Sequence, residues 1–196
     1  MPILPAEPDM YPPDLWTAAA GDLDPGHAWW CLHTKPRQEK ATARRLRSLG
    51  IAHYLPQVLQ EGRTPGGRKI RSVIPLFPSY LFLRGDQSHR LEALKGNTLV
   101  RVLEVVDQEG LIRDLRQIYR MLSSGLPVVP EPTHPVGTWV RILSGPLAGL
   151  IGMVVRRGKR DQFVAVVHFL GRGATVDLQD WQVERVEGIR TQQSVG

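Results

Sequence analysis

The stretch Leu76-Phe77-Pro78-Ser79-Tyr80-Leu81-Phe82-Leu83 decides the fold, and it holds three of the chain's eight Phe and Tyr residues within six positions. On an alternating strand, Phe77 and Ser79 would share one face and Tyr80 and Phe82 the other. Aromatic side chains therefore fall on both faces. Either both faces are buried or one of them is a binding surface, and the proline at position 78 can shift the register between the two halves.

Positive charge is concentrated around this stretch. The chain of 196 residues has a net charge of +6, and residues 29–84 hold eleven of its 25 Lys and Arg residues but only two acids, Glu39 and Glu61. The remainder of the chain has a slight excess of acids. A localised basic surface is typical of proteins that bind a polyanion, most often nucleic acid. The alternative is a solvated surface that only keeps the protein soluble.

The segment upstream of residue 76 predicts four elements. Trp29 to His33 forms a short β-prone run, and Pro36 suits the first turn of a helix that Gly50 ends. Within that helix, Ala43, Leu46 and Leu49 share an apolar face. Residues 53–59 favour a second strand, and residues 61–73, with Gly66-Gly67 among basic residues, favour an extended hairpin.

The segment downstream continues the same alternation. After the strand at 76–83, residues 86–95 predict a short helix with Leu91 and Leu94 facing inward, and residues 100–106 predict a fourth strand. Apolar residues at 111, 115, 118 and 122 indicate an amphipathic helix. The order β-α-β-β-α-β predicts an α+β domain with the split βαβ pattern, in which an antiparallel sheet carries its helices on one face.

Composition divides the rest of the chain. We expect a disordered acidic and Pro-rich tail over 1–27, the first domain over 28–123, a Pro-rich linker over 124–135, a second domain over 136–187 and a tail over 188–196. The second domain has Val-rich runs separated by Gly turns and no helical period. Five short strands in about fifty residues predict a small five-stranded β-barrel.

Several protein classes are disfavoured. No apolar run approaches a membrane span, no secretory signal begins the chain, and one cysteine, Cys31, excludes an internal disulfide. We expect a cytoplasmic monomer without cofactor or metal, in which His33, His53 and Cys31 are ordinary structural residues. The shortage of acids in the basic segment and the absence of catalytic motifs argue against an enzyme.

Two motifs resemble one protein family. The first is Trp29-Trp30, Lys35 and Gln38-Glu39 followed, after the basic hairpin, by Phe77-Pro78-Ser79-Tyr80-Leu81-Phe82. The second is Val136-Gly137-x-Trp139-Val140-Arg141-Ile142-x-x-Gly145-Pro146-Leu147-Ala148-Gly149-x-x-Gly152. The first resembles the N-terminal domain of NusG-type transcription factors, and the second resembles the KOW motif of their C-terminal domain, an SH3-like barrel. The resemblance spans nearly the whole chain from Trp29 to Glu187.

The resemblance implies a non-catalytic elongation factor that suppresses pausing or termination. Its N-terminal domain would bind the clamp helices of the largest RNA polymerase subunits, and its KOW domain would recruit Rho or a small-subunit ribosomal protein. The polymerase-binding residues implied are Phe77, Pro78, Tyr80, Phe82 and Trp30. Those facing upstream or non-template DNA are Lys35, Arg37, Arg44, Arg63, Arg68, Lys69 and Arg71. Those for KOW partners are Gly145, Pro146, Phe169, Leu170 and Arg172.

The branch of the family is a separate question. The sequence Pro-Leu-Phe-Pro-x-Tyr-Leu-Phe at 75–82 is closer to that of the specialised RfaH-like antiterminators than to that of general NusG. The Val- and Gly-rich second domain favours a β-barrel over the helical form known in one branch, and Trp139, Trp181 and Phe169 are expected mainly in its core. The alternatives are a general NusG-type factor and a KOW-containing protein that binds the ribosome or RNA.

Overall fold

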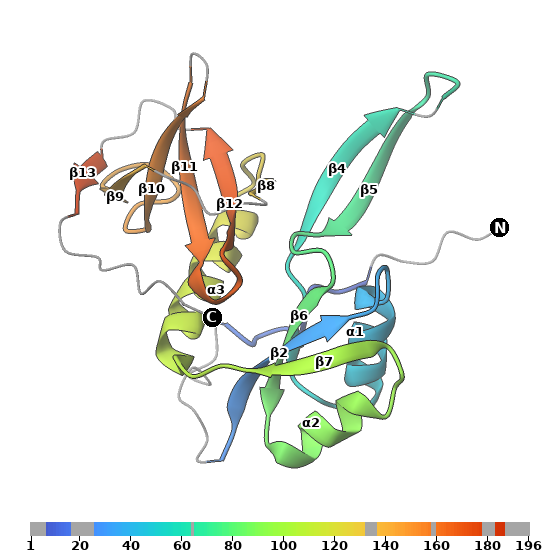
Figure 1. Ribbon diagram of the computed structural model, residues 1–196. Helices are drawn as coiled ribbons and strands as arrows, with labels where there is room; N and C mark the ends of the chain where they lie inside the picture. Colours follow the sequence, from blue (N-terminus) through green and yellow to red (C-terminus); the bar gives the residue numbers. More distant parts are fainter. Residues whose placement is uncertain are drawn as a thin grey trace. The chain divides into compact units, whose positions relative to one another are not determined.

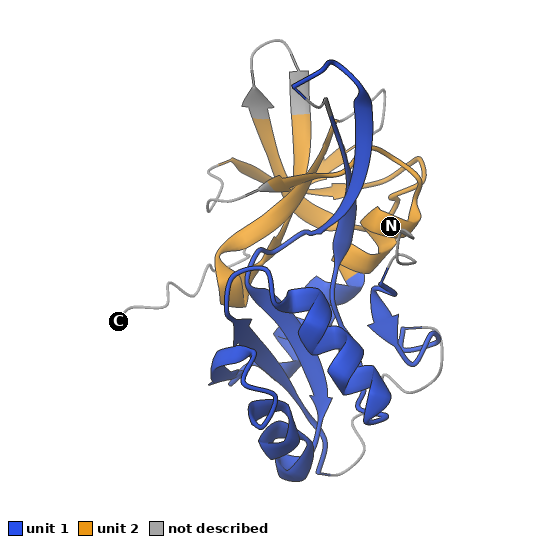
Figure 2. Cartoon of the chain, turned by 90° about the vertical axis from the view of Figure 1, so that its right-hand side faces the viewer, with its two compact units in different colours: residues 1–116 blue, residues 117–196 orange. Residues whose placement is uncertain are grey.

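The chain is seen in a computed structural model that describes residues 7–16, 26–63, 65–131, 137–157, 160–177 and 183–186. It divides into two compact units, residues 1–116 and 117–196 (Figure 2). The fold is mixed α/β, with antiparallel sheets, as the sequence predicts. Within the described ranges, none of the helices combines the length and apolar character needed to cross a membrane.

Unit 1 is built on a five-stranded antiparallel sheet with the order β1-β3-β6-β2-β7 (Figure 1). Its strands are β1 (Met10–Tyr11), β2 (Ala28–Thr34), β3 (His53–Tyr54), β6 (Tyr80–Gly85) and β7 (Leu99–Glu104). Its helices are α1 (Glu39–Ser48), α2 (Gln87–Leu94) and the first part of α3 (Gln108–Ser123). The predicted order of strands and helices is present.

Helices α1 and α2 cover one face of this sheet. Ala43 and Leu46 of α1 and Ala93 of α2 are buried in one core cluster with Leu81 and Leu83 of β6. Two details differ from expectation. Pro36 precedes α1, because Arg37 takes a left-handed φ of 63° and the helix begins only at Glu39. Leu91 and Leu94 do not face inward but remain 49% and 40% exposed.

The segment before Trp29 is not a disordered tail over residues 7–16. Met10 and Tyr11 pair with Tyr54 and His53, so that β1 becomes an edge strand of the sheet. Leu15 is buried, and the indole of Trp16 stacks on Trp29 with ring centroids 5.2 Å apart. These apolar contacts offset the loss of conformational entropy on ordering the segment. The Pro-rich composition alone did not indicate such contacts. We call residues 7–16 the N-terminal strap.

The predicted basic hairpin is formed by β4 (Gln57–Arg63) and β5 (Lys69–Pro75), which form a two-stranded sheet and extend away from the five-stranded sheet (Figure 1). The expected strand over 53–59 is thereby split, because Pro56 lacks an N–H and separates β3 from β4. At its base, Val58 is buried and the Lys40 ammonium of α1 donates to the Val73 carbonyl at 2.6 Å. The root of the hairpin is thus attached to the body of unit 1.

Unit 2 contains a six-stranded antiparallel sheet with the order β13-β9-β10-β11-β12-β8. Its strands are β8 (Val129–Glu131), β9 (Thr138–Ile142), β10 (Ile151–Arg157), β11 (Arg160–Val167), β12 (Arg172–Asp177) and β13 (Val183–Arg185), with a short 3-10 helix, η1, at His168–Leu170. The last five strands correspond to the five predicted. Strand β8 was not predicted: it lies in the expected linker and pairs with β12.

The end of α3 also belongs to unit 2. Ile118 and Met121 are fully buried there. The Gln117 side-chain oxygen accepts from the Ile151 N–H at 2.8 Å, and Arg120 donates to the Ala148 carbonyl at 2.7 Å. These bonds join the end of the helix to unit 2, whereas the sequence assigned all of it to the first domain.

Candidate functional site

The aromatic stretch begins as a turn and becomes a strand only at Tyr80. The Leu76 N–H donates to Pro56, and the Ser79 N–H donates to the Glu39 carboxylate at 2.7 Å. Ser79 has a φ of 69°, and its carbonyl accepts from the Thr34 N–H at 2.8 Å. These bonds from three segments fix the turn, and they break the simple alternation that the sequence suggested.

The turn places Phe77 on the same side as Phe82. Their rings meet edge to face with centroids 6.3 Å apart, and both side chains are buried, at 1% and 0% exposure. Neither offers surface to a partner, so both act in the core of unit 1. Of the expected polymerase-binding residues in this stretch, Pro78 is exposed and Tyr80 is half-buried.

Tyr80 lies on the sheet face opposite α1 and α2. It pairs with His33, their rings stack with centroids 5.0 Å apart, and His33 pairs in turn with the exposed Arg101 of β7. These three residues cross three adjacent strands, and we call them the open row. Sequence reasoning treated His33 as ordinary and passed over Arg101. Period-two alternation identifies His33 and Arg101 as neighbours of Tyr80 only when the pairing register of the strands is known.

The rest of that sheet face is closed. Trp29, Tyr54 and Phe82 are buried, and Trp16 of the N-terminal strap packs on two of them, stacked on Trp29 and edge-on to Tyr54 at 5.3 Å. Cys31 is also fully buried, and burial raises the pKa of its thiol to about 12. The strap covers this face at Trp29 and Tyr54, and the open row lies toward the other end of β2.

Trp30 is not part of this surface. It pairs with Leu83 and packs with the helix-side core, its indole N–H donates to the Gly85 carbonyl at 3.2 Å, and the Arg90 guanidinium lies 5.3 Å from its ring centre. Because side chains alternate along β2, Trp30 and His33 point to opposite faces. The structure thus separates Trp30 from Tyr80.

The basic residues around α1 are partly neutralised. Lys35 and Arg37 are exposed, and the Lys35 ammonium donates to Asn97 at 2.9 Å. Arg44 and Arg47 both pair with the carboxylate of Glu7 from the N-terminal strap, whose side chain is only 4% exposed. The N-terminal strap therefore contacts the basic segment through one buried carboxylate, that of Glu7.

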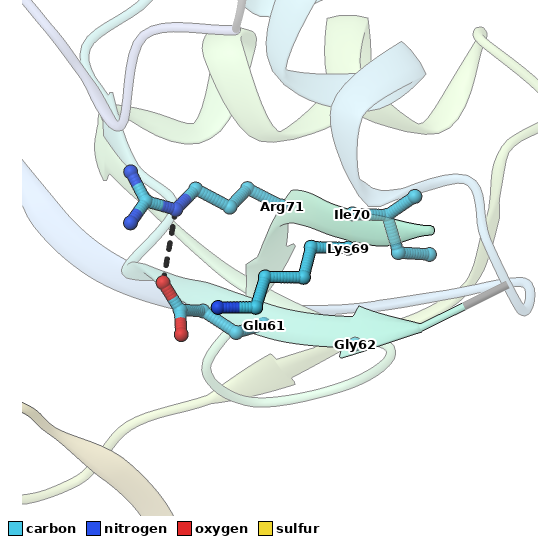
Figure 3. Close-up of a pocket in the computed structure, with 5 residues that line it drawn as sticks. All are labelled: Glu61, Gly62, Lys69, Ile70 and Arg71. Carbon is cyan, nitrogen blue, oxygen red and sulfur yellow. Dashed lines mark hydrogen bonds and ion pairs between the residues drawn. The ribbon is translucent and has the colours of Figure 1, made fainter. Parts of the chain in front are cut away.

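The hairpin presents the clearest cationic surface. Arg68, Lys69 and Arg71 are exposed, and Arg63 faces Lys69 in the strand register, its side chain lying outside the described set. A hollow of about 280 Å³ is lined by Glu61, Gly62, Lys69, Ile70 and Arg71. Within it, Arg71 pairs with Glu61 at 2.9 Å (Figure 3). The glycine opposite Ile70 leaves that apolar side chain 42% exposed. The hollow thus combines positive charge with an apolar surface.

The expected partner-binding residues of unit 2 fall in two turns. Gly145, with a φ of 83°, and exposed Pro146 lie between β9 and β10, whereas Phe169 and Leu170 lie between β11 and β12 and Arg172 begins β12. Because β10 and β11 are antiparallel, both turns lie at the same end of the sheet. Phe169, expected mainly in the core, is 38% exposed, while Trp139 packs on the core and stacks on His168; Trp181 lies outside the described residues.

Comparisons with known proteins cover most of unit 1 and the start of unit 2 by a family model. The model of the NusG family, described as transcription termination factor nusG, matches residues 27–133. A solved structure of NusG from Thermotoga maritima, described by its domain interaction, is similar at 18% sequence identity with a TM-score of 0.47, covering 82% of this chain and 98% of that one. A search of the curated proteins gives no match.

Proposed function

The chain belongs to the NusG family of transcription factors, and from this membership and its surfaces we propose that it binds RNA polymerase during elongation and suppresses pausing or termination. Its partner on the polymerase would be the clamp helices of the largest subunits. No residue in this proposal performs chemistry, so the protein acts by binding alone.

The observation that carries the proposal is the contrast between Tyr80 and its neighbours. Phe77 and Phe82 are fully occupied in the core, whereas Tyr80 lies half-buried beside exposed Pro78 on a face that α1 and α2 leave uncovered. A rigid aromatic ring with one accessible side and a polar tip is the type of anchor that dominates protein interfaces. The open row and Pro78 form the proposed polymerase-binding surface.

The hairpin supports a second contact, with nucleic acid. Arg68, Lys69 and Arg71 are exposed on an extension whose base is attached to α1. Contacts from such side chains to phosphates are independent of sequence and position the protein. In this proposal the hairpin contacts upstream or non-template DNA. Lys35 and Arg37, just before α1, add to the positive electrostatic potential that attracts the DNA.

Unit 2 would recruit a further protein through its two turns at one end of the sheet. Gly145, Pro146 and Phe169 have exposed surface there, with Leu170 and Arg172 half-buried beside them. Rho and a small-subunit ribosomal protein are the candidate partners. The wording of residues 75–82 favours a specialised RfaH-like role over that of a general factor, and mapping the occupancy of the protein across a genome distinguishes the two.

Binding to purified core RNA polymerase, after nuclease treatment, tests the main proposal. Tyr80→Ala should weaken binding at least about ten-fold while the thermal transition is retained. Phe82→Ala should instead destabilise unit 1 by about 3–5 kcal/mol, because it empties a fully buried site. Leu91→Ala, which removes an exposed apolar side chain from α2 on the other face, is the matched control and should bind normally.

Two results would reject the polymerase assignment. One is full polymerase binding by a folded Tyr80→Ala variant. The other is co-purification with ribosomal RNA and not with core polymerase, which would favour the alternative of a ribosome- or RNA-binding protein.

The salt dependence of DNA binding tests the hairpin. Changing both Arg68 and Lys69 to Gln should reduce the slope of log K against log salt by about 0.9 per lost contact on duplex DNA, or about 0.7 on single strands. Lys95→Gln removes an exposed charge from the end of α2 and serves as the control. A slope unchanged in the double variant would remove the hairpin from the nucleic-acid surface.

A further inference from the structure

The end of the β2–β6 ladder brings three potential metal ligands together. Ala28 pairs with Gly85, so His27 and Asp86 flank the last pair of the ladder from either strand. His89 lies in the first turn of α2, which follows directly (Figure 1). One ligand atom from each of His27, Asp86 and His89 lies within 4.8 Å of those of the other two.

The backbone is adapted to this approach. His89 Nδ1 lies 2.9 Å from an Asp86 carboxylate oxygen, and the rings of His27 and His89 meet edge-on with centroids 5.8 Å apart. A Cβ at position 85 would lie 2.8 Å from both Cβ and Nδ1 of His89. Glycine at this position is therefore what allows the imidazole to lie over the end of the ladder.

Asp86 has the charge and the free oxygen that a metal requires. Among the described residues, its hydrogen bonds from Ser88 and from the His89 backbone both reach Oδ1. Oδ2 is left for a cation, and the side chains of Asp86 and His89 are 44% and 36% exposed, which gives an ion access from solvent.

We propose that His27, Asp86 and His89 form a binding site for one divalent transition-metal ion of the Zn²⁺ type. Two imidazoles and one carboxylate suit zinc and its neighbours in the first transition row better than Mg²⁺ or Ca²⁺. Around a tetrahedral ion with bonds of about 2.0–2.1 Å, ligand atoms lie about 3.4 Å apart. Closing the cluster to that size would require side-chain rotations, and water would occupy the remaining position.

The competing explanation is that the cluster only caps α2. Asp86 accepts from the His89 N–H at 2.9 Å, and His89 Nδ1 lies 3.2 Å from the Asp86 N–H, which is a capping box. The cap involves Asp86 and His89, whereas His27 lies outside it. Variants that preserve the cap therefore separate the two explanations.

Isothermal titration of the untagged full chain with ZnCl₂, repeated with Co²⁺ to follow the ligand-field absorption, tests the site. The expected result is one ion per chain. Asp86→Ser and His89→Gln remove a ligand while keeping residue types that suit the N-cap and the N3 position, and His27→Gln lies outside the cap. Each should lower affinity about ten-fold or more, whereas His168→Gln in unit 2 should leave it unchanged.

Two outcomes overturn the proposal. One is the absence of binding up to about 1 mM ion. The other is equal affinity in the parent and in the three ligand variants, with circular dichroism showing that α2 is intact. Since polymerase binding is not measured, neither outcome depends on the proposed function.

Discussion

Replacing Glu7 by Gln should both loosen the N-terminal strap and strengthen binding to DNA. The substitution keeps the size of the side chain but removes the charge that pairs with Arg44, at 3.5 Å, and with Arg47. Glu7 is almost fully buried, whereas the two arginine side chains are 51% and 36% exposed. Because the arginines remain solvated after the change, the loss in the free energy of unfolding is smaller than for a fully buried ion pair.

The size of the effect follows from this asymmetry. Hydrogen bonds to charged groups contribute about 1.5–3 kcal/mol when well shielded, and exposed pairs contribute about 0–1 kcal/mol. We expect Glu7→Gln to lower the free energy of unfolding of unit 1 by about 1–2 kcal/mol. For a unit of this size that corresponds to a fall in Tm of roughly 3–10 °C.

Urea unfolding followed by tryptophan fluorescence measures this loss, because Trp16 of the strap is stacked on Trp29. Glu61→Gln is the control: its pair with Arg71 is exposed on both sides, at 67% and 72%, and should contribute nothing measurable to stability. In DNA titrations, Glu7→Gln should show a steeper salt dependence, by about 0.9 for each arginine that gains a phosphate contact. If the unfolding midpoint and the salt slope of the variant both equal those of the parent protein, the stabilising ion pairs of Glu7 with Arg44 and Arg47 are refuted.

Three further predictions concern single residues. Gly152→Ala should destabilise unit 2 by about 1–3 kcal/mol in thermal unfolding, since the new Cβ would lie 2.4 Å from the Val164 carbonyl oxygen; an unchanged Tm would contradict this packing. Burial lowers the pKa of His53, and the Arg47 charge adds to this, so its contribution to stability is complete above a pH of about 6.5 and declines as the pH falls below that value. His53→Gln should flatten the dependence of the urea midpoint between about pH 7.5 and pH 5.5, and an equally steep dependence would assign it to other groups. Cys31 should resist alkylation until unit 1 unfolds, because its buried thiol has a pKa of about 12; rapid labelling of the native protein would show that the sheet opens.

Local signals in the sequence predicted most of the elements of unit 1. The spacing of Ala43 and Leu46 identified the buried face of α1, and Asp86 begins α2 as its N-cap. The Gly66-Gly67 pair marked the hairpin correctly. Each of these features depends on residues a few positions apart, which is the range over which periodicity, caps and turns act.

What the sequence did not reveal depends on distant partners. The N-terminal strap is ordered because Trp16 meets Trp29 and Tyr54, and nothing near Trp16 in the chain indicates this. Strand β8 exists because β12 offers it an edge some forty residues later. Strand pairing of this kind is set by context more than by propensity.

The sequence pointed to residues 76–83 as the candidate surface, and the structure changes which of these residues are exposed. Alternation assigned Phe77 and Tyr80 to opposite faces, yet the left-handed φ of Ser79 turns Phe77 back onto Phe82. Because of this one backbone conformation, Phe77 lies in the core and not on the expected contact surface. The same register brought His33 and Arg101 beside Tyr80, and neither residue type indicates such a role by itself.

The turn at residues 76–79 gives the two proposed surfaces a common support. Strand β5 leads through this turn directly into Tyr80, and the turn is held by Glu39 of α1 and by the backbone of Thr34. The hairpin base is held to the same helix by Lys40. A protein bound on the open row would therefore rest on the elements that fix the direction of the hairpin, and the orientation of its basic residues relative to that partner would be set within unit 1 alone. Such preorganisation reduces the entropic cost of making both contacts at once, and it explains why buried Phe77 matters to the surface without touching a partner: its burial keeps the turn in place.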